Sequence, residues 1–121
     1  MDRLFVYGTL RPGSKNEHAQ RLAENARHIG VATMSGRLYR LGNYLVLARS
    51  QSKEDRVTGD VFEGVTAELF ERLDEYEGAE YRRQLGEVTM GDGRTFSAYC
   101  YRYALPQELQ SPLPQEGDFH Q

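Results

Sequence analysis

The stretch RQLGEVTMGDGRTFSAYCYRY, residues 83–103, decides how the sheet of this chain is built. Two strand-like runs, Arg83–Met90 and Thr95–Tyr103, flank the triplet Gly91-Asp92-Gly93. Strands joined by so short a glycine turn run antiparallel, as a β-hairpin. The sequence therefore predicts an antiparallel hairpin over this part of the chain.

Four runs upstream of this hairpin also have the composition of β-strands. One is an apolar run that stops at Gly8, and one alternates loosely and is interrupted by Gly36. In the last, Val57 and Val61 face one way and Phe62 the other. Gly36 predicts a bend or a bulge in the long run. The expected strands are Arg3–Tyr7, His28–Leu41, Tyr44–Ala48 and Arg56–Glu63.

Two segments are predicted to be helices, Glu17–Asn25 and Ala67–Glu77. Thr66 is a good N-cap for the second helix and Gly78 a good C-terminal stop. One or two helices among five or six short strands indicate an α+β domain. We expect a small, mixed but mostly antiparallel β-barrel, with the helices packed outside it or across one end.

Length and charge limit what the chain can be. At 121 residues it fits one domain, 1–121, in which 104–121 form a proline-containing surface tail. A net charge of −3 gives no electrostatic reason to expect nucleic acid or an anionic membrane as a partner. The first apolar run is too short for a signal peptide or a membrane span, so we expect a cytoplasmic protein.

No residue pattern requires a metal or a cofactor. The single cysteine, Cys100, excludes an internal disulfide and a multi-cysteine metal site, and we expect it to be buried and structural. The three histidines have no metal-ligand spacing. Tyr99, Tyr101 and Tyr103 form a row that could stack on bases, but without a basic groove ordinary sheet packing is the expected role.

Glu77 differs from the other acidic residues of the second predicted helix. At about 100° per residue its side chain falls inside the apolar arc of that helix. The arc is formed by Leu69, Phe70, Leu73 and Tyr76. Burial and the negative end of the helix dipole would both raise the pKa of this carboxylate, which suits proton transfer near neutrality. The alternative is that the helix frays at Gly78 and Glu77 turns into solvent.

Several motifs, in order along the chain, resemble the γ-glutamylcyclotransferase-like family, which includes small bacterial AIG2-like proteins and butirosin-pathway cyclotransferases. The two main motifs are Phe5-Val6-Tyr7-Gly8-Thr9-Leu10-Arg11 and Leu73-Asp74-Glu75-Tyr76-Glu77-Gly78. The supporting matches are Gly36-Arg37-Leu38-Tyr39, Gly59-Asp60-Val61-Phe62, Tyr81-Arg82-Arg83, Ala98-Tyr99-Cys100-Tyr101 and Gly117-Asp118-Phe119. The resemblance spans nearly the whole chain.

This resemblance implies a mixed barrel and an enzyme that releases 5-oxoproline from γ-glutamyl amines or γ-glutamyl amino acids. The α-amine of the substrate would attack its own γ-carbonyl, with Glu77 as the general acid/base. Backbone N–H groups of the first motif would stabilise the developing oxyanion. The expected substrate-binding residues are Tyr7, Gly8, Thr9, Leu10, Tyr81 and Tyr103.

Some alternatives stay open at this point. Many members of the family have a Gly-Tyr-Pro turn where this chain has Gly42-Asn43-Tyr44-Leu45, so the substrate is not defined. Glu80 is a second carboxylate close to Glu77. A non-catalytic barrel that binds a small ligand or a protein is the alternative function. Neither the leaving amine nor the oligomeric state follows from the sequence.

Overall fold

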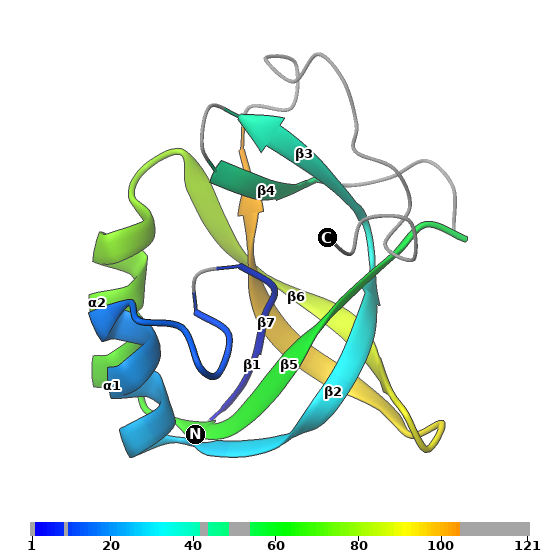
Figure 1. Ribbon diagram of the computed structural model, residues 1–121, viewed down its shortest axis with the longest axis horizontal. Coiled ribbons are helices and arrows are strands. Elements are labelled where there is room, and N and C mark those ends of the chain that lie inside the picture. The colour runs from blue at the N-terminus through cyan, green and yellow to red at the C-terminus, as the bar shows by residue number, and fades with distance from the viewer. Residues whose placement is uncertain (1, 9, 42–43, 49–53, 105–121) are drawn as a thin grey trace.

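Five of the seven strands that the structure describes close into a barrel, in the order β1–β5–β2–β6–β7 (Figure 1). The structure is a computed structural model, and it describes residues 2–8, 10–41, 44–48 and 54–104, with only the backbone of 40, 41, 44 and 45. The barrel strands are β1 (Asp2–Val6), β2 (Arg27–Ser35), β5 (Arg56–Val65), β6 (Tyr81–Met90) and β7 (Thr95–Tyr103). Two further strands, β3 (Arg37–Leu41) and β4 (Tyr44–Ala48), form a separate antiparallel pair.

One pair of barrel strands is parallel and the others are antiparallel. The predicted β6–β7 hairpin is confirmed, because its ladder runs from Tyr81 opposite Tyr103 down to Thr89 opposite Thr95. β1 meets β7 in parallel, with Leu4 opposite Tyr99, and this contact closes the barrel. The mixed, mostly antiparallel barrel that the sequence predicts is therefore correct.

Each face of the barrel wall has its own apolar core. The interior core includes Phe5, Met34, Val61, Val88 and Cys100. On the outer face, α1 (Glu17–Asn25) and α2 (Ala67–Glu77) lie side by side and cover one flank of the barrel (Figure 1). The outer core includes Leu4, Val6, Leu22, Phe62, Phe70 and Leu73. The strands serve both cores because successive side chains point to opposite faces.

Both helices begin and end where the sequence predicts, because their caps form. The side chain of Asn16 accepts hydrogen bonds from the backbone N–H groups of His18 and Ala19, at 2.8 and 3.3 Å. Thr66 Oγ1 accepts from the backbone N–H of Leu69, at 3.2 Å. Gly78 ends α2 with a φ of 84°, a conformation that glycine adopts without strain.

Gly36 separates two strands, whereas the sequence predicted one long bent strand over His28–Leu41. Its φ is 151°, and an added Cβ would lie 2.7 Å from Leu47 Cδ1. The irregular pairing of β2 lies instead between His28 and Gly30.

The ends of three other strands were also predicted wrongly. The first strand ends at Val6, because Tyr7 turns away from the ladder. β5 continues to Val65, which pairs with Asp2, and β6 begins at Tyr81, which pairs with Tyr103. Pairing with a distant strand sets these ends, and local composition does not reveal it. Of the expected tail, only Ala104 lies within the described residues.

Candidate active site

Glu77 is the last residue of α2 and is partly buried. Burial raises the pKa of its carboxyl group from 4.5 to about 7. The structure gives this carboxylate no hydrogen bond or ion pair with any described residue. A carboxyl group of this kind exchanges its proton near neutral pH and is chemically available.

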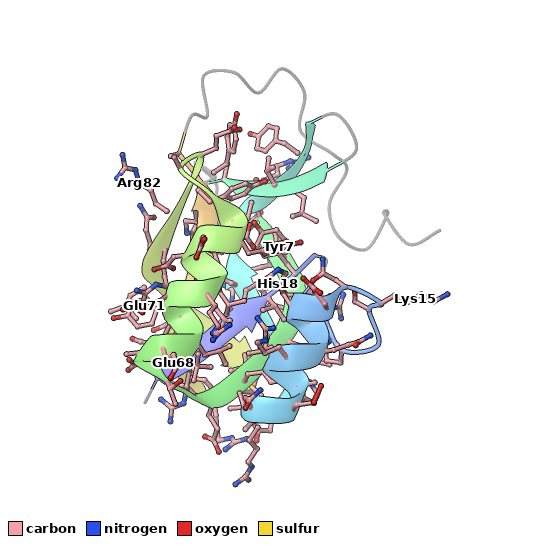
Figure 2. All side chains as sticks on the ribbon, turned by 90° about the vertical axis from the view of Figure 1, so that its left-hand side faces the viewer. Tyr7, Lys15, His18, Glu68, Glu71 and Arg82 are labelled. Carbon is pink, nitrogen blue, oxygen red and sulfur yellow. The ribbon has the colours of Figure 1, made fainter. Side chains whose placement is uncertain are left out.

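Tyr7 lies at the point where the chain leaves β1, beside the upper end of α2 (Figure 2). Its hydroxyl donates a hydrogen bond to the backbone oxygen of Tyr101 at 2.7 Å and accepts one from the backbone N–H of Leu47 at 3.2 Å. Burial raises the pKa of Tyr7 well above its usual value, and the charge of the nearby Glu77 raises it further. Tyr7 is therefore a neutral phenol fixed within electrostatic reach of Glu77.

The hydroxyl of Tyr7 has no donor left to offer. Its one proton is committed to the backbone oxygen of Tyr101, and one of its two lone pairs accepts from Leu47. Only the second lone pair is available to a ligand. Tyr7 and Glu77 can thus present two acceptors to a donor-rich group.

The loop after β1 folds into tight turns next to Tyr7. The backbone N–H of Arg11 donates to the oxygen of Gly8 at 3.1 Å, and that of Ser14 donates to the oxygen of Arg11 at 3.2 Å. Leu10 is buried in the outer core, with 4% of its surface exposed. Thr9 lies outside the described residues, so its expected role is not addressed.

Gly8 is not required by the fold that surrounds it. Its φ is not positive, and a Cβ added there would meet no described atom within 4 Å beyond its chain neighbours. At Gly59, by contrast, an added Cβ would lie 2.2 Å from the backbone oxygen of Val6. Gly59 serves packing, whereas Gly8 leaves open space next to the backbone of the loop.

Tyr81 and Tyr103, two further expected binding residues, form a cross-strand pair. Their rings meet edge to face with centroids 5.7 Å apart. Tyr103 is buried and Tyr81 partly buried. The proximity of Tyr81 also raises the pKa of Tyr7, so Tyr81 lies on the same side as Tyr7 and Glu77. Tyr103 contacts this group through the ring of Tyr81.

The competing carboxylate, Glu80, lies in a different environment from Glu77. Its side chain is exposed, and its backbone oxygen accepts a hydrogen bond from the N–H of Ala104 at 2.8 Å. Of the two carboxylates, only Glu77 is partly buried.

A polar network that the sequence did not predict supports the end of α2. The Tyr101 hydroxyl donates to Asp74 Oδ1 at 2.6 Å, and Arg83 donates to both carboxylate oxygens of Asp74 at 2.9 and 3.2 Å. The Arg83 guanidinium also lies 4.3 Å from the ring centre of Phe70. A surface pocket of about 560 Å³ opens here, lined by Asp74, Gly78, Tyr81, Arg82, Arg83, Gln84 and Tyr101.

The sequence held only part of the signal for this network. Alternation along β7 places Tyr99, Tyr101 and Tyr103 on one face, and sheet packing was the role predicted for this row, with Tyr103 also expected to bind substrate. Tyr99 packs edge to face on Phe70, with ring centroids 5.4 Å apart. The bond from Tyr101 to Asp74 needs the relative placement of β7 and α2, which no local pattern contains.

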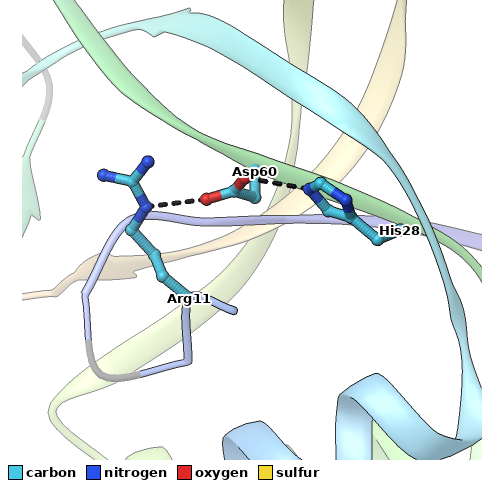
Figure 3. A network of polar contacts seen from close by, with 3 residues as sticks. All are labelled: Arg11, His28 and Asp60. Atoms are coloured by element: carbon cyan, nitrogen blue, oxygen red, sulfur yellow. Dashed lines mark hydrogen bonds and ion pairs between the residues drawn. The ribbon is translucent and has the colours of Figure 1, made fainter. Parts of the chain in front are cut away.

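A second unpredicted network lies on the outer wall of the barrel (Figure 3). Asp60 on β5 is only 5% exposed. Its carboxylate binds Arg11 Nε at 2.7 Å and His28 Nε2 at 2.9 Å. In the sequence Asp60 is one polar residue in an alternating strand, and nothing there marks it as buried.

Within the described residues, no three His, Cys, Asp or Glu side chains are grouped so that they could hold a metal ion. None of the helices in the described part of the chain is long and apolar enough to cross a membrane.

A family model described as "Gamma-glutamyl cyclotransferase, AIG2-like" matches residues 4–121. The chain belongs to this family. A search of curated protein sequences found no significant match.

Solved structures of an AIG2-like protein and of two other proteins share the fold. An AIG2-like protein from Mus musculus superposes with a TM-score of 0.81 at 26% identity, over 96% of this chain and 86% of that one. A protein from Arabidopsis thaliana gives a TM-score of 0.68 at 27% identity, over 85% and 68%. YkqA from Bacillus subtilis gives 0.70 at 27% identity over 85% of this chain, which spans only 36% of the length of YkqA. The barrel described above is thus the fold of these solved structures.

Proposed function

We propose that this protein is a γ-glutamyl cyclotransferase-type enzyme that releases 5-oxoproline from a small γ-glutamyl amine or γ-glutamyl amino acid. Membership of the γ-glutamyl cyclotransferase, AIG2-like family supports the reaction class. The observation that carries the proposal is the partly buried Glu77, with a pKa of about 7, beside Tyr7 and the loop that follows it.

In the proposed reaction the substrate supplies its own nucleophile. Glu77 takes a proton from the α-ammonium group, and the freed amine attacks the γ-carbonyl carbon. Glu77 passes this proton to the leaving nitrogen as the bond from the carbon to that nitrogen breaks. The attacking nitrogen, now part of a five-membered lactam, loses its second proton through Glu77 to the departing amine, which leaves as an ammonium ion. Because the attack is intramolecular, the enzyme needs no nucleophile and mainly holds the folded substrate.

The acceptor pair of Tyr7 and Glu77 fits the α-ammonium group of such a substrate. The Tyr7 hydroxyl has only a lone pair to offer, because its proton is bound to the backbone oxygen of Tyr101. Ionised Glu77 also only accepts. An ammonium group carries three donors and a positive charge, so this pair would bind it and keep its proton next to Glu77.

The loop would stabilise the charge that develops on the substrate oxygen. We assign the donors to the backbone N–H groups of Gly8, Thr9 and Leu10. The open space at Gly8 supports this assignment, because it lets a substrate approach the backbone. We assign the side walls of the substrate site to Tyr81 and Tyr103.

The decisive experiment measures 5-oxoproline release from a panel of γ-glutamyl amines and γ-glutamyl amino acids. Glu77→Gln keeps the shape of the side chain and removes the titrating group, so kcat should fall by about 10²–10⁴-fold. Glu80→Gln is the matched control and should keep wild-type activity, because Glu80 is exposed.

Each result of this experiment has a defined meaning. If Glu80→Gln collapses while Glu77→Gln stays active, Glu77 is not the acid/base. If folded wild type releases nothing from the panel, the enzyme proposal loses its support, and the non-catalytic small-ligand or protein-binding barrel becomes the better account.

A further inference from the structure

Asp60 is a buried carboxylate that the proposed reaction does not use. It lies near the middle of β5, opposite Val6 of β1 and Val31 of β2. With 5% of its surface exposed, it needs strong partners to offset the loss of water. It has two, and they come from different parts of the chain (Figure 3).

One partner, Arg11, lies in the loop that carries the proposed oxyanion donors. Its Nε is 2.7 Å from Asp60 Oδ2, and its side chain is 37% exposed. The backbone of Arg11 also holds both turns of this loop, through Gly8 on one side and Ser14 on the other. The bond from Asp60 to Arg11 therefore ties the loop to the barrel wall at the centre of its turns.

The barrel wall behind Asp60 offers little room for movement. An atom added at the Cβ position of Gly59 would lie 2.2 Å from the backbone oxygen of Val6 and 2.7 Å from Phe5 Cζ. The end of β1 is thus pressed against β5 one residue before Asp60. A carboxylate on this part of the wall therefore has a fixed position, to which the loop that follows Tyr7 can be held.

The other contacts do not replace this bond. Leu10 also holds the loop through apolar packing, but such contacts have no preferred direction. His28, on β2, binds the second oxygen of Asp60 at 2.9 Å, and no hydrogen bond or ion pair joins it to the described residues of the loop. A charge-assisted hydrogen bond is directional and roughly twice as strong as a neutral one.

We propose that Asp60 is a positioning residue that acts through Arg11 to fix the loop of residues 8–14 against the barrel. Its consequence for catalysis rests on the proposed function, in which the N–H groups of this loop stabilise the oxyanion. The consequence for the loop itself does not depend on any activity.

The first test is kinetic and uses Asp60→Ala, Arg11→Gln and the double variant. A displaced loop weakens transition-state contacts, so kcat should fall on the order of 10²-fold while KM changes little. The double variant should lose no more than the worse single variant, because the two residues act as one unit. If the fall in kcat of the double variant equals the product of the two single-variant falls, the proposal is overturned.

The second test is hydrogen exchange followed by mass spectrometry on the peptide that covers residues 8–14. Asp60→Ala and Arg11→Gln should both speed exchange there and leave α2 unchanged. His28→Gln should leave the loop as in wild type. Unchanged exchange of residues 8–14 in both loop variants would overturn the proposal, even if wild type proves inactive, so the two proposals fail separately.

A matched control separates positioning from general stability. Asp55, which directly precedes β5, is also buried and is paired with an arginine of β3, Arg37, at 3.1 Å. Asp55→Ala should lower the free energy of unfolding without speeding exchange over residues 8–14. If Asp60→Ala does not fold, Arg11→Gln tests the same bond from its more exposed side.

Discussion

The carboxyl group of Glu77 lies in an environment that favours its neutral, protonated form. Its folded-state pKa of about 7 lies above the ordinary 4.5, so between these values the folded protein binds more protons than the unfolded one. The free energy of unfolding should therefore fall as pH rises from 4.5 to 7, by up to about 3 kcal/mol. Below pH 4.5 the ionisation of Glu77 does not lower the free energy of unfolding, and above pH 7 the full decrease has been reached.

The measurement is urea unfolding at a series of pH values for wild type and Glu77→Gln. The difference in stability between the two proteins should grow in favour of the variant across this window. Identical pH profiles would contradict the raised pKa. In the activity assay, wild-type kcat/KM should rise with pH and level off above about 7, since the base must be ionised.

Gly8 and Gly59 should respond to alanine in opposite ways. Gly8→Ala meets open space, so stability should stay the same or rise by about 0.4–1 kcal/mol. The new methyl group would hinder the substrate, and kcat/KM should fall on the order of 10²-fold. Gly59→Ala, the control, should destabilise the fold by about 1–3 kcal/mol or more. Full activity in folded Gly8→Ala would contradict a substrate position next to this loop.

At the level of single residues, the sequence predicted the partial burial of Glu77 but not the burial of Asp60. Glu77 could be predicted because a helix repeats every 3.6 residues, and its angle to the apolar side chains follows from the letters alone. The burial of Asp60 depends on where Arg11 and His28 lie, 49 and 32 positions away along the chain. Its place in an alternating strand gave no sign of these partners.

Among the elements, the contact between β7 and α2 determines where Glu77 lies. Tyr101 reaches across with a 2.6 Å hydrogen bond to Asp74, one turn before Glu77. Its backbone oxygen accepts from Tyr7 at the same time. One residue of β7 thus holds both the helix and the aromatic side chain of the site.

Tyr101→Phe removes the bond to Asp74 and keeps the bond to Tyr7, which uses the backbone. The free energy of unfolding should fall by roughly 1.5–3 kcal/mol, because the acceptor is charged. Chemical denaturation measures this change. Tyr99→Phe is the control and should cost less, since no hydrogen bond joins its hydroxyl to another residue that the structure describes. Equal losses in the two variants would show that the bond to Asp74 adds nothing.

The elements themselves were predicted well where local signals fix them. The predicted caps at Thr66 and Gly78 set the second helix, and the glycine turn set the hairpin, whereas the Asn16 cap of the first helix is a finding of the structure. The parallel pairing of β1 with β7 was not predicted strand by strand. It joins residues 95 positions apart, and the composition of neither strand indicates which strand it pairs with.

Over the whole molecule, the two cores are joined because they share the same strands. Phe5 points into the barrel, while its neighbours Leu4 and Val6 point out to the helices. Loss of one core therefore disrupts the strands that form the other. We expect the domain to unfold in a single cooperative transition.

Leu73→Ala tests this cooperativity from the helical side. Leu73 lies on the buried face of α2, so its truncation should lower the free energy of unfolding by about 2–5 kcal/mol. Tyrosine fluorescence and far-UV circular dichroism should follow one transition with an unchanged urea dependence. Leu85→Ala, at a residue 60% exposed, should change stability little. Two separated transitions in Leu73→Ala would mean that the cores unfold independently.

The parallel closure of the barrel has a consequence for how the protein is made. A ribosome synthesises β1 first and reaches Tyr99, the partner of Leu4, 95 residues later. At roughly 5–20 residues per second, the new chain exposes one edge of β1 for on the order of 5–20 seconds. During translation this apolar strand is the segment that a chaperone would need to shield, and slow codons before β7 would lengthen its exposure.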